Sequence, residues 1–301
     1  MITELKDAEK HLKVKGLPNP RTEAEYIFCH LLNCERIDLY TEDAELNQFQ
    51  RQGLNKLISQ RVKGEPLQYA LGQTCFYGFE FKVQKGVFIP RPETEILVDA
   101  VLNKLRTTNH EPRTNILDLC TGCGNIAISL TKMLPHYKMF ASDISEKAIH
   151  TACENARLNN VSCNIPNEDS CLRTSSGSRP FGIEFRCGNL FKPWEEESES
   201  FFDIITCNPP YIKTKELKDL PKDVKNEPKR ALDGGKDGLK FYETICKEAL
   251  FYLKEKGCIF FEVGPDIANA VRQILSKDFY DVKIIKDYNG LDRVVVAWIK
   301  Y

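Results

Sequence analysis

Four consecutive residues, Asn208, Pro209, Pro210 and Tyr211, combine two hydrogen-bond acceptors with an aromatic ring. They directly follow the apolar run FFDIITC, which predicts a short buried strand. The side-chain oxygen of Asn208 and the backbone carbonyl of Pro209 could both accept hydrogen bonds from one planar NH2 group. Proline has a fixed φ and no N–H, so the Pro209 carbonyl is rigidly held.

Such a pair of acceptors suits the transfer of a group onto an amide nitrogen. This nitrogen is a poor nucleophile because its lone pair is delocalised into the carbonyl. Two acceptors would align the NH2 group and bind it more strongly as positive charge develops. We therefore predict that Asn208, Pro209 and Tyr211 are catalytic and that no general base is needed. The structural alternative is a rigid turn that ends the strand, with Tyr211 in a packing role.

A glycine-containing loop earlier in the chain predicts a nucleoside cofactor. The stretch ILDLCTGCGNIAISL reads as strand, turn and helix, with Gly122 and Gly124 in the turn. The next predicted strand ends at Asp143, about twenty residues later, where a carboxylate can accept hydrogen bonds from ribose hydroxyls. Asp118, at the end of the first strand, would be unfavourable beside a pyrophosphate. A cationic cofactor such as S-adenosylmethionine is therefore favoured, and a tight turn without a ligand is the alternative.

The elements that must position these loops alternate between strands and helices from about residue 93 onward. Short apolar runs such as NILDLC and CIFFEVG predict parallel strands that are covered on both faces. The segments VKIIKDY and RVVVAWI, separated by NGLD, predict a hairpin that adds an antiparallel strand. The predicted fold class is therefore α/β, a Rossmann-like sheet that is mostly parallel, has a C-terminal antiparallel strand and follows a small helical N-terminal domain.

The chain is expected to have three parts. Residues 1–73 predict a helical domain, residues 74–92 a β-hairpin connector, and residues 93–301 the α/β domain that carries the predicted site. Residues 162–182 are rich in Ser, Asn, Pro and Gly, and they predict a long surface loop to which we assign no function.

Some helix boundaries and faces can also be predicted. Thr22 and Glu25 form a possible capping box at the start of the helix TEAEYIFCHLLN. Phe49 is expected to face inward from the helix in LNQFQRQGLNKLISQRVKG. The helix in DGLKFYETICKEALFYLKEKG is expected to end at Gly257.

The composition favours a protein of the cytoplasm. The chain has 301 residues and a formal net charge of -1, and its charged N-terminus has no apolar signal core. No apolar run reaches the roughly 20 residues that span a bilayer. Only Cys120 and Cys123 have the spacing of metal ligands, and without a second pair we expect no metal site. A protein whose main ligand is nucleic acid usually carries a basic excess, which this chain lacks.

From about Gly64 to its end, the chain resembles the S-adenosylmethionine-dependent glutamine methyltransferases that modify peptide-chain release factors, the HemK type. The resemblance rests, in order, on GEPLQYALGQTCFYG, FIPRPETEILV, LDLCTGCGNIAI, ASDIS, NPPYI and EPKRALDGGKDGL. It implies a class I methyltransferase sheet and methyl transfer to N5 of the glutamine in the Gly-Gly-Gln loop of class I release factors, supporting translation termination. S-adenosylmethionine would be the cofactor and S-adenosylhomocysteine the product.

The resemblance also implies roles for individual residues and partners. The residues implied in cofactor binding are Cys120, Thr121, Gly122, Cys123, Gly124, Asp143, Asn189, Leu190 and Asn208. Those implied in binding the target glutamine are Arg91, Thr94, Asn208, Pro209, Pro210 and Tyr211. Position 123 is Cys where the family usually has Ser or Thr, so a hydroxyl–cofactor hydrogen bond is not expected there. The N-terminal helices would help to bind the release factor. We expect no direct nucleic-acid or membrane partner, and a monomer.

Other functions share parts of this pattern. The tetrapeptide also resembles that of DNA amino-methyltransferases, which flip an adenine or cytosine into a similar pocket. Those enzymes need phosphate contacts from Lys and Arg, whereas KTKELKDLPKDVKNEPKR mixes both signs of charge. A binding module without catalysis would bind the cofactor without turnover, and a dehydrogenase would bind a nicotinamide in the same fold. Methyl transfer assays and cofactor titrations distinguish these functions.

Overall fold

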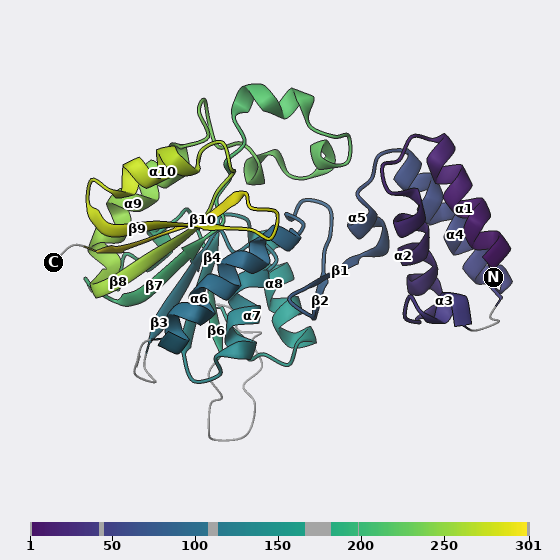
Figure 1. The fold of residues 1–301 in the computed structure, drawn as a ribbon. Helices are drawn as coiled ribbons and strands as arrows, with labels where there is room; N and C mark the ends of the chain where they lie inside the picture. Colours follow the sequence, from purple (N-terminus) through teal and green to yellow (C-terminus); the bar gives the residue numbers. More distant parts are fainter. Residues whose placement is uncertain (1, 42–44, 108–113, 166–181, 198, 300–301) are drawn as a thin grey trace, which may run out of the picture. The chain divides into compact units, whose positions relative to one another are not determined.

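The computed structural model describes residues 2–41, 45–107, 114–165, 182–197 and 199–299 (Figure 1). The chain divides into two compact units. The helical unit comprises Met1–Gln73 and Pro221–Asn226, and the sheet unit comprises Thr74–Leu220 and Glu227–Tyr301. The functional borders at residues 73 and 92 stay predictions.

The helical unit is built around a small apolar core. Its helices are α1 (Ile2–Val14), α2 (Pro20–Leu32), α3 (Asp38–Thr41), α4 (Gln48–Val62) and α5 (Leu67–Leu71). Leu12, Phe28 and Leu39 are fully buried in this core, which therefore joins three of the helices.

The start of α4 shows why one predicted core residue lies outside the core. Asn47 and Gln50 form a capping box, in which each side chain accepts a hydrogen bond of 2.9 Å from the backbone N–H of the other. Phe49 follows within this first turn and is 83% exposed, so its predicted inward position is wrong. It lies five residues before Leu54, about 140° away around the helix, and the two cannot share one face.

The predicted capping box of α2 is also wrong. The helix begins at Pro20, so Thr22 lies inside its first turn and cannot act as the N-cap. The side chain of Glu25 instead accepts hydrogen bonds from Arg21 and Tyr40. Tertiary partners therefore replace the local cap that the sequence indicates.

The sheet unit contains a hairpin and one large sheet. The strands are β1 (Gln73–Phe76), β2 (Phe79–Lys82), β3 (Asn115–Leu119), β4 (Lys138–Asp143), β5 (Cys163–Asn164), β6 (Ile183–Cys187), β7 (Phe202–Cys207), β8 (Leu253–Glu262), β9 (Phe279–Lys286) and β10 (Asp292–Ile299). β1 and β2 pair with each other, and the other eight form a sheet of order β5-β6-β4-β3-β7-β8-β10-β9. The first six strands of this order are parallel, and β10 runs antiparallel to both neighbours. This confirms the predicted α/β fold with its antiparallel C-terminal strand.

Helices cover both faces of the large sheet (Figure 1). α6 (Glu95–Thr107), α7 (Asn125–Met133) and α8 (Glu146–Leu158) pack on one face, and α9 (Lys240–Tyr252) and α10 (Ala268–Leu275) pack on the other. Successive residues of one strand enter opposite cores, as Ile204 and Ile205 of β7 do. The central strands are buried on both faces, which explains their continuous apolar runs.

Two boundaries of this unit differ from the predictions. α9 ends at Tyr252 rather than at Gly257, because β8 starts at Leu253 and Gly257 belongs to that strand. The predicted loop 162–182 begins with the short strand β5, which pairs with β6. The rest of that loop, residues 166–181, lies outside the described residues.

None of the helices in the described part of the chain combines the length and apolar character needed to cross a bilayer.

Candidate functional site

The predicted site residues follow neighbouring parallel strands at their carboxyl ends. Cys120 follows β3, Asp143 ends β4, and Asn208 follows β7. Leu119 pairs in register with Ser142 on one side and with Cys207 on the other. After β3 the chain continues to β4 and β6 on one side of it and later crosses to β7 on its other side, and ligands of open α/β sheets bind at such a switch point.

The glycines of the loop after β3 serve two different purposes. Gly122 has a φ of +57°, and a Cβ built on it would meet no atom within 4 Å. Its backbone is therefore open to close approach by a ligand. Gly124 has a φ of +84°, and a Cβ there would lie 3.0 Å from the side chains of Ala152 and Ile128. Gly124 thus allows the loop to pack on α8.

The loop is tied to the strand that carries Asp143. The Asp143 carboxylate accepts hydrogen bonds of 2.9 Å from the backbone N–H groups of Gly122 and Ser145. Burial raises the pKa of Asp143, although these two bonds and the charge of Arg230 oppose the rise. Each carboxylate oxygen has a second lone pair, so both can still accept a hydrogen bond from a ribose hydroxyl.

Asp118 acts beneath the loop rather than at its surface. Its carboxyl oxygens accept hydrogen bonds from the hydroxyls of Thr121, at 2.6 Å, and Thr206, at 3.0 Å. Complete burial raises the pKa of Asp118 to about 7. Because Asp118 is fully buried, it orients the loop through Thr121.

The remaining residues predicted near the cofactor differ in their exposure. Cys123 is buried, and burial raises the pKa of its thiol to about 12, so it stays neutral. Asn189 is exposed, whereas Leu190 is buried and has a positive φ of 48°. The carbonyl of Leu190 accepts a hydrogen bond from Ser142 Oγ at 3.4 Å, which joins the turn after β6 to β4.

The Asn208–Tyr211 tip keeps its two acceptors available. The Nδ2 of half-buried Asn208 donates to Oγ1 of Thr94 over 3.3 Å. Across the described residues, no hydrogen bond is donated to Asn208 Oδ1 or to the Pro209 carbonyl. Both oxygens are therefore available as acceptors, and the Asn208 amide is held by its hydrogen bond to Thr94.

Three glycines that the sequence analysis did not assign hold the other end of this tip. A Cβ on Gly234 would lie 2.7 Å from Tyr211 Cα, and one on Gly238 would lie 2.5 Å from the Tyr211 carbonyl oxygen. A Cβ on Gly264 would lie 3.2 Å from the Tyr211 ring. The contacts at Gly234 and Gly238 require glycine, and the run LDGGKDG, which holds both, was the available signal.

The connector residues Arg91 and Thr94 reach the site in different ways. Thr94 is buried and contacts Asn208 directly. Arg91 forms an ion pair with the buried Glu227, which also accepts a 3.2 Å hydrogen bond from the backbone N–H of Ile89. The charge of Arg91 lowers the pKa of Tyr211, although burial raises it overall to about 12.

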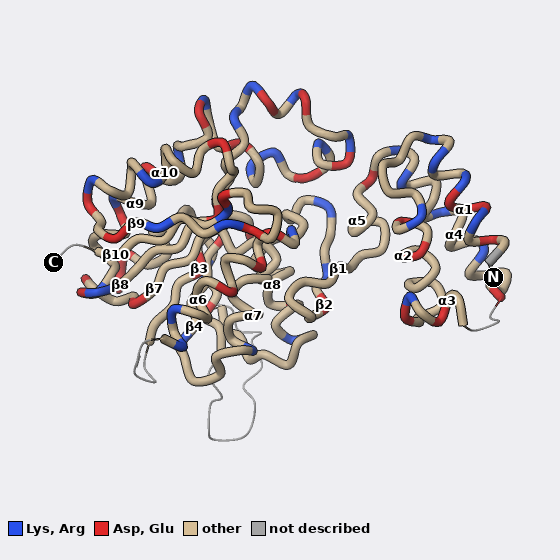
Figure 2. The backbone as a smooth tube through the Cα atoms, in the orientation of Figure 1, with Lys and Arg blue, Asp and Glu red and all other residues tan. Residues whose placement is uncertain are grey.

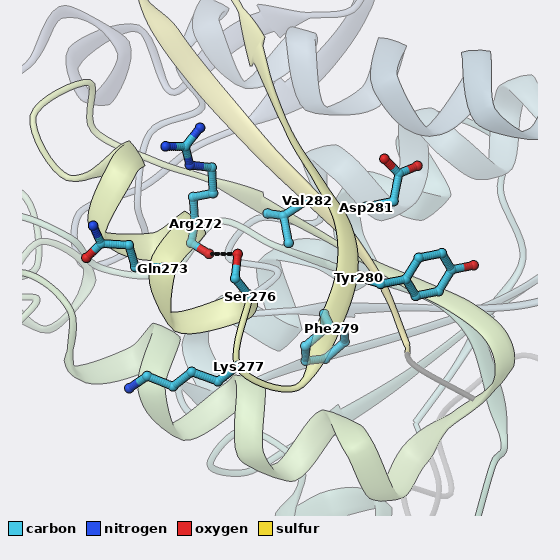
Figure 3. Close-up of a pocket in the computed structure, with 8 residues that line it drawn as sticks. All are labelled: Arg272, Gln273, Ser276, Lys277, Phe279, Tyr280, Asp281 and Val282. Atoms are coloured by element: carbon cyan, nitrogen blue, oxygen red, sulfur yellow. Dashed lines mark hydrogen bonds between the residues drawn. The ribbon is translucent and has the colours of Figure 1, made fainter.

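A surface pocket is formed by α10, β9 and the turn between them (Figure 3). No predicted site residue lines it. The lining residues are Arg272, Gln273, Ser276, Lys277, Phe279, Tyr280, Asp281 and Val282. Across the ranges that the structure describes, no group of three or more His, Cys, Asp or Glu side chains could hold a metal ion.

Comparisons with known proteins agree with this fold. The model described as the PrmC N-terminal domain matches residues 4–72, and that of the methyltransferase small domain matches residues 78–292. A release factor glutamine methyltransferase from Thermodesulfovibrio yellowstonii is 42% identical over 91% of both chains. One from Koribacter versatilis is 35% identical over 96% of this chain and 95% of its own.

Solved structures with lower identity show the fold alone. The hMettl16 catalytic domain has a TM-score of 0.52 at 13% identity and covers 85% of this chain and 83% of its own. A T. thermophilus 16S rRNA methyltransferase has a TM-score of 0.51 at 15% identity, over 76% of this chain and 50% of its own. The sheet and the matched domain define the protein as a Rossmann-like methyltransferase. The chain belongs to the release factor glutamine methyltransferase family.

Proposed function

We propose that this protein transfers a methyl group from S-adenosylmethionine to N5 of the glutamine in the Gly-Gly-Gln loop of class I release factors. The observation that carries the proposal is the pair of available acceptors, Asn208 Oδ1 and the Pro209 carbonyl, beside the glycine loop. The names of its relatives specify glutamine and a release factor.

The residues present fit S-adenosylmethionine. The open backbone at Gly122 leaves room for a ligand, and the half-buried Asp143 carboxylate can accept hydrogen bonds from ribose hydroxyls. Cys120, Thr121 and Cys123 complete the loop after β3, and Asn189 and Leu190 would lie beside the adenine. When bound, the cofactor supplies an electrophilic methyl group.

The protein would activate the glutamine by orientation and electrostatics. Asn208 and Pro209 accept hydrogen bonds from the substrate NH2 group, which directs its lone pair and stabilises the charge that develops on nitrogen. Tyr211 stays a neutral phenol at physiological pH, because burial raises its pKa to about 12, and its ring offers a flat face to the carboxamide. Pro210 and Arg91 would line the same crevice.

The helical unit would help to bind the release factor. We further propose that the protein acts as a monomer and in the cytoplasm. Sedimentation of the purified chain at micromolar concentration would test the monomer.

The nucleic-acid alternative is less well supported. Lys and Arg are interspersed with Asp and Glu along residues 213–240, so the segment that follows the tip has no long basic stretch (Figure 2). Phosphate binding needs clustered Lys and Arg side chains.

The test is incubation of the purified protein with tritiated cofactor and either a class I release factor or duplex DNA. We expect labelling of the release factor alone, and mass spectrometry should place one methyl group on the loop glutamine. A release factor variant with Asn in place of that glutamine is the control and should stay unlabelled. Labelling of DNA, or of the control, would refute the proposal.

A further inference from the structure

Glu262 is a buried acid at the end of β8 that the proposed mechanism does not use. It is 1% exposed, and its carboxyl lies close enough to the Thr94 hydroxyl for that hydroxyl to lower its pKa. Its Oε2 atom is also buried and has no hydrogen-bond partner among the described residues. A buried carboxyl with an unsatisfied oxygen is costly, which calls for a reason to keep it there.

The neighbouring contacts give Glu262 a route to the site. Asn208 Nδ2 donates to Thr94 Oγ1 over 3.3 Å, and the Thr94 hydroxyl can donate in turn to the Glu262 carboxylate. The donors thus point in one direction, from Asn208 through Thr94 to Glu262. The position of Glu262 is itself fixed, because Tyr242 Oη donates to its backbone carbonyl over 2.8 Å.

The direction of this chain of hydrogen bonds decides which end of the Asn208 amide faces the substrate. With its NH2 group held by Thr94, Asn208 must present Oδ1 on the other side. If the amide rotated by half a turn, Asn208 would offer a donor to the substrate NH2 group, and the acceptor pair would be lost. An acid beyond Thr94 opposes this rotation, because it accepts a hydrogen bond from the Thr94 hydroxyl and leaves Thr94 Oγ1 as an acceptor for Asn208.

We propose that Thr94 and Glu262 are positioning residues that lock the Asn208 amide with its oxygen toward the target carboxamide. This inference rests on the proposed function. It gives Thr94 a role behind Asn208 rather than in direct contact with the substrate.

Several charged groups surround Glu262. Burial raises its pKa to about 7, the hydrogen bond from Thr94 and the charges of Arg293 and Arg91 oppose this rise, and Glu93 adds to it. The phenols of Tyr211 and Tyr242 are also near, and both are neutral because burial raises their pKa. The acid therefore changes charge near neutral pH, and a Gln at this position would keep an acceptor for Thr94 but would not titrate.

Matched pairs of variants test the lock. Thr94→Val removes the hydroxyl at nearly constant volume, whereas Thr94→Ser keeps it. We expect kcat to fall about tenfold in the Val variant, as for the loss of one buried hydrogen bond, and to stay within about twofold of wild type in the Ser variant. The KM for the cofactor should be unchanged in both.

Glu262→Leu should behave like Thr94→Val, and Glu262→Gln should keep most activity with a flatter pH profile between pH 6 and 8.

A second measurement follows the Asn208 amide itself, without substrate or cofactor. In protein labelled with ¹⁵N-Asn, the side-chain NH2 signals of Asn208 are those lost in Asn208→Ala. We expect them to shift, and their hydrogen exchange to accelerate, in Thr94→Val and Glu262→Leu but not in Thr94→Ser.

The two measurements separate this inference from the proposed function. Equal kcat values and equal Asn208 signals in Thr94→Val and Thr94→Ser would overturn the lock even if the wild type methylates the glutamine. If the wild type does not methylate the glutamine, the proposed function fails, and the NMR comparison alone still decides whether Thr94 and Glu262 hold the amide. A variant that does not fold is replaced by the other pair, since each pair tests the same chain of hydrogen bonds.

Discussion

At the scale of single residues, the site side chains use only part of their hydrogen-bonding capacity within the protein. Asn208 uses its NH2 group on Thr94 and keeps its oxygen free, and Asp143 uses one lone pair of each oxygen on the backbone. Each residue thus uses part of its hydrogen-bonding capacity for its own orientation. The remainder is available to a ligand in a fixed direction.

Asn208→Ala should separate catalysis from cofactor binding. The variant removes one of the two acceptors that stabilise developing charge, and comparable losses reduce rates by about 10²–10³-fold. We expect that reduction in single-turnover methylation, with a cofactor Kd within a few-fold of wild type by calorimetry. A turnover rate like that of the wild type would refute the role of the acceptor pair.

Asp143→Ala should have the opposite effect. The carboxylate would be lost both as an acceptor for ribose hydroxyls and as the partner of the Gly122 N–H group. We expect a marked rise in the cofactor Kd in a calorimetric titration. The cofactor Kd of Asp143→Asn, which retains one oxygen, should lie between those of Asp143→Ala and the wild type. An unchanged Kd in Asp143→Ala would exclude the ribose role.

The pKa of Asp118 predicts a pH dependence of stability. Its folded value of about 7 lies above the usual value of about 4, so the folded state binds more protons between these pH values. This contribution to the free energy of unfolding is complete below about pH 4 and is lost as the pH rises through 7, by about 1.4 kcal/mol for each pH unit between the two pKa values. Denaturant titrations should show a flatter pH dependence in Asp118→Asn than in wild type. If stability depends on pH in the same way in both proteins, the Asp118 carboxyl of the folded protein is ionised across this pH range and its pKa is not raised.

At the scale of elements, the tip after β7 is shaped by contacts with distant glycines. Gly238 has a φ of +83°, and its Cβ would lie 2.5 Å from the carbonyl oxygen of Tyr211. Gly290 has nearly the same φ, +79°, but a Cβ there would meet nothing within 4 Å. The two positions therefore separate backbone strain from steric displacement of the tip.

We expect Gly290→Ala to cost only the left-handed strain, about 1 kcal/mol in the free energy of unfolding, with kcat unchanged. Gly238→Ala should cost more stability and should also lower kcat, because Tyr211 must move. Thermal unfolding and methylation rates of both variants provide the measurement. Equal kcat values would show that the position of Tyr211 tolerates displacement.

Boundaries of elements were the weakest sequence predictions, and the errors have both local and tertiary causes. Gly257 was expected to end α9. However, β8 begins at Leu253, and the residues after Tyr252 belong to this strand, which pairs with β7, rather than to the helix. Phe49 matched a loose apolar pattern, yet the cap at Asn47 sets where α4 begins and which of its residues face the core.

At the scale of the whole molecule, residues far apart in sequence meet in the helical unit. Arg61 is buried and pairs with Glu23 over 2.7 Å and with Asp223 over 3.0 Å. Asn226 donates a hydrogen bond to the Gly64 carbonyl over 2.6 Å. The chain therefore leaves the sheet unit after Leu220, contributes a short segment to the helical unit and returns at Glu227.

Arg61→Leu should destabilise the helical unit strongly. It leaves Glu23 buried without its partner, and breaking a buried ion pair in this way costs about 3–5 kcal/mol. The control is Arg51→Leu, since the pair of Arg51 with Glu4 is largely exposed and should contribute less than about 1 kcal/mol. Urea unfolding of the full chain measures both. Equal effects would contradict the structural importance of the buried pair.

The sequence by itself determined the class of fold and the chemistry of the site. Continuous apolar runs specify strands buried on both faces, and the residue types after them specify acceptors, because those properties belong to local stretches of chain. Only the tertiary structure decided what holds these residues in place. Thr94, Glu262 and the glycines around Tyr211 lie many residues away from Asn208 in the sequence, and no local pattern records which side chains will meet across a sheet edge.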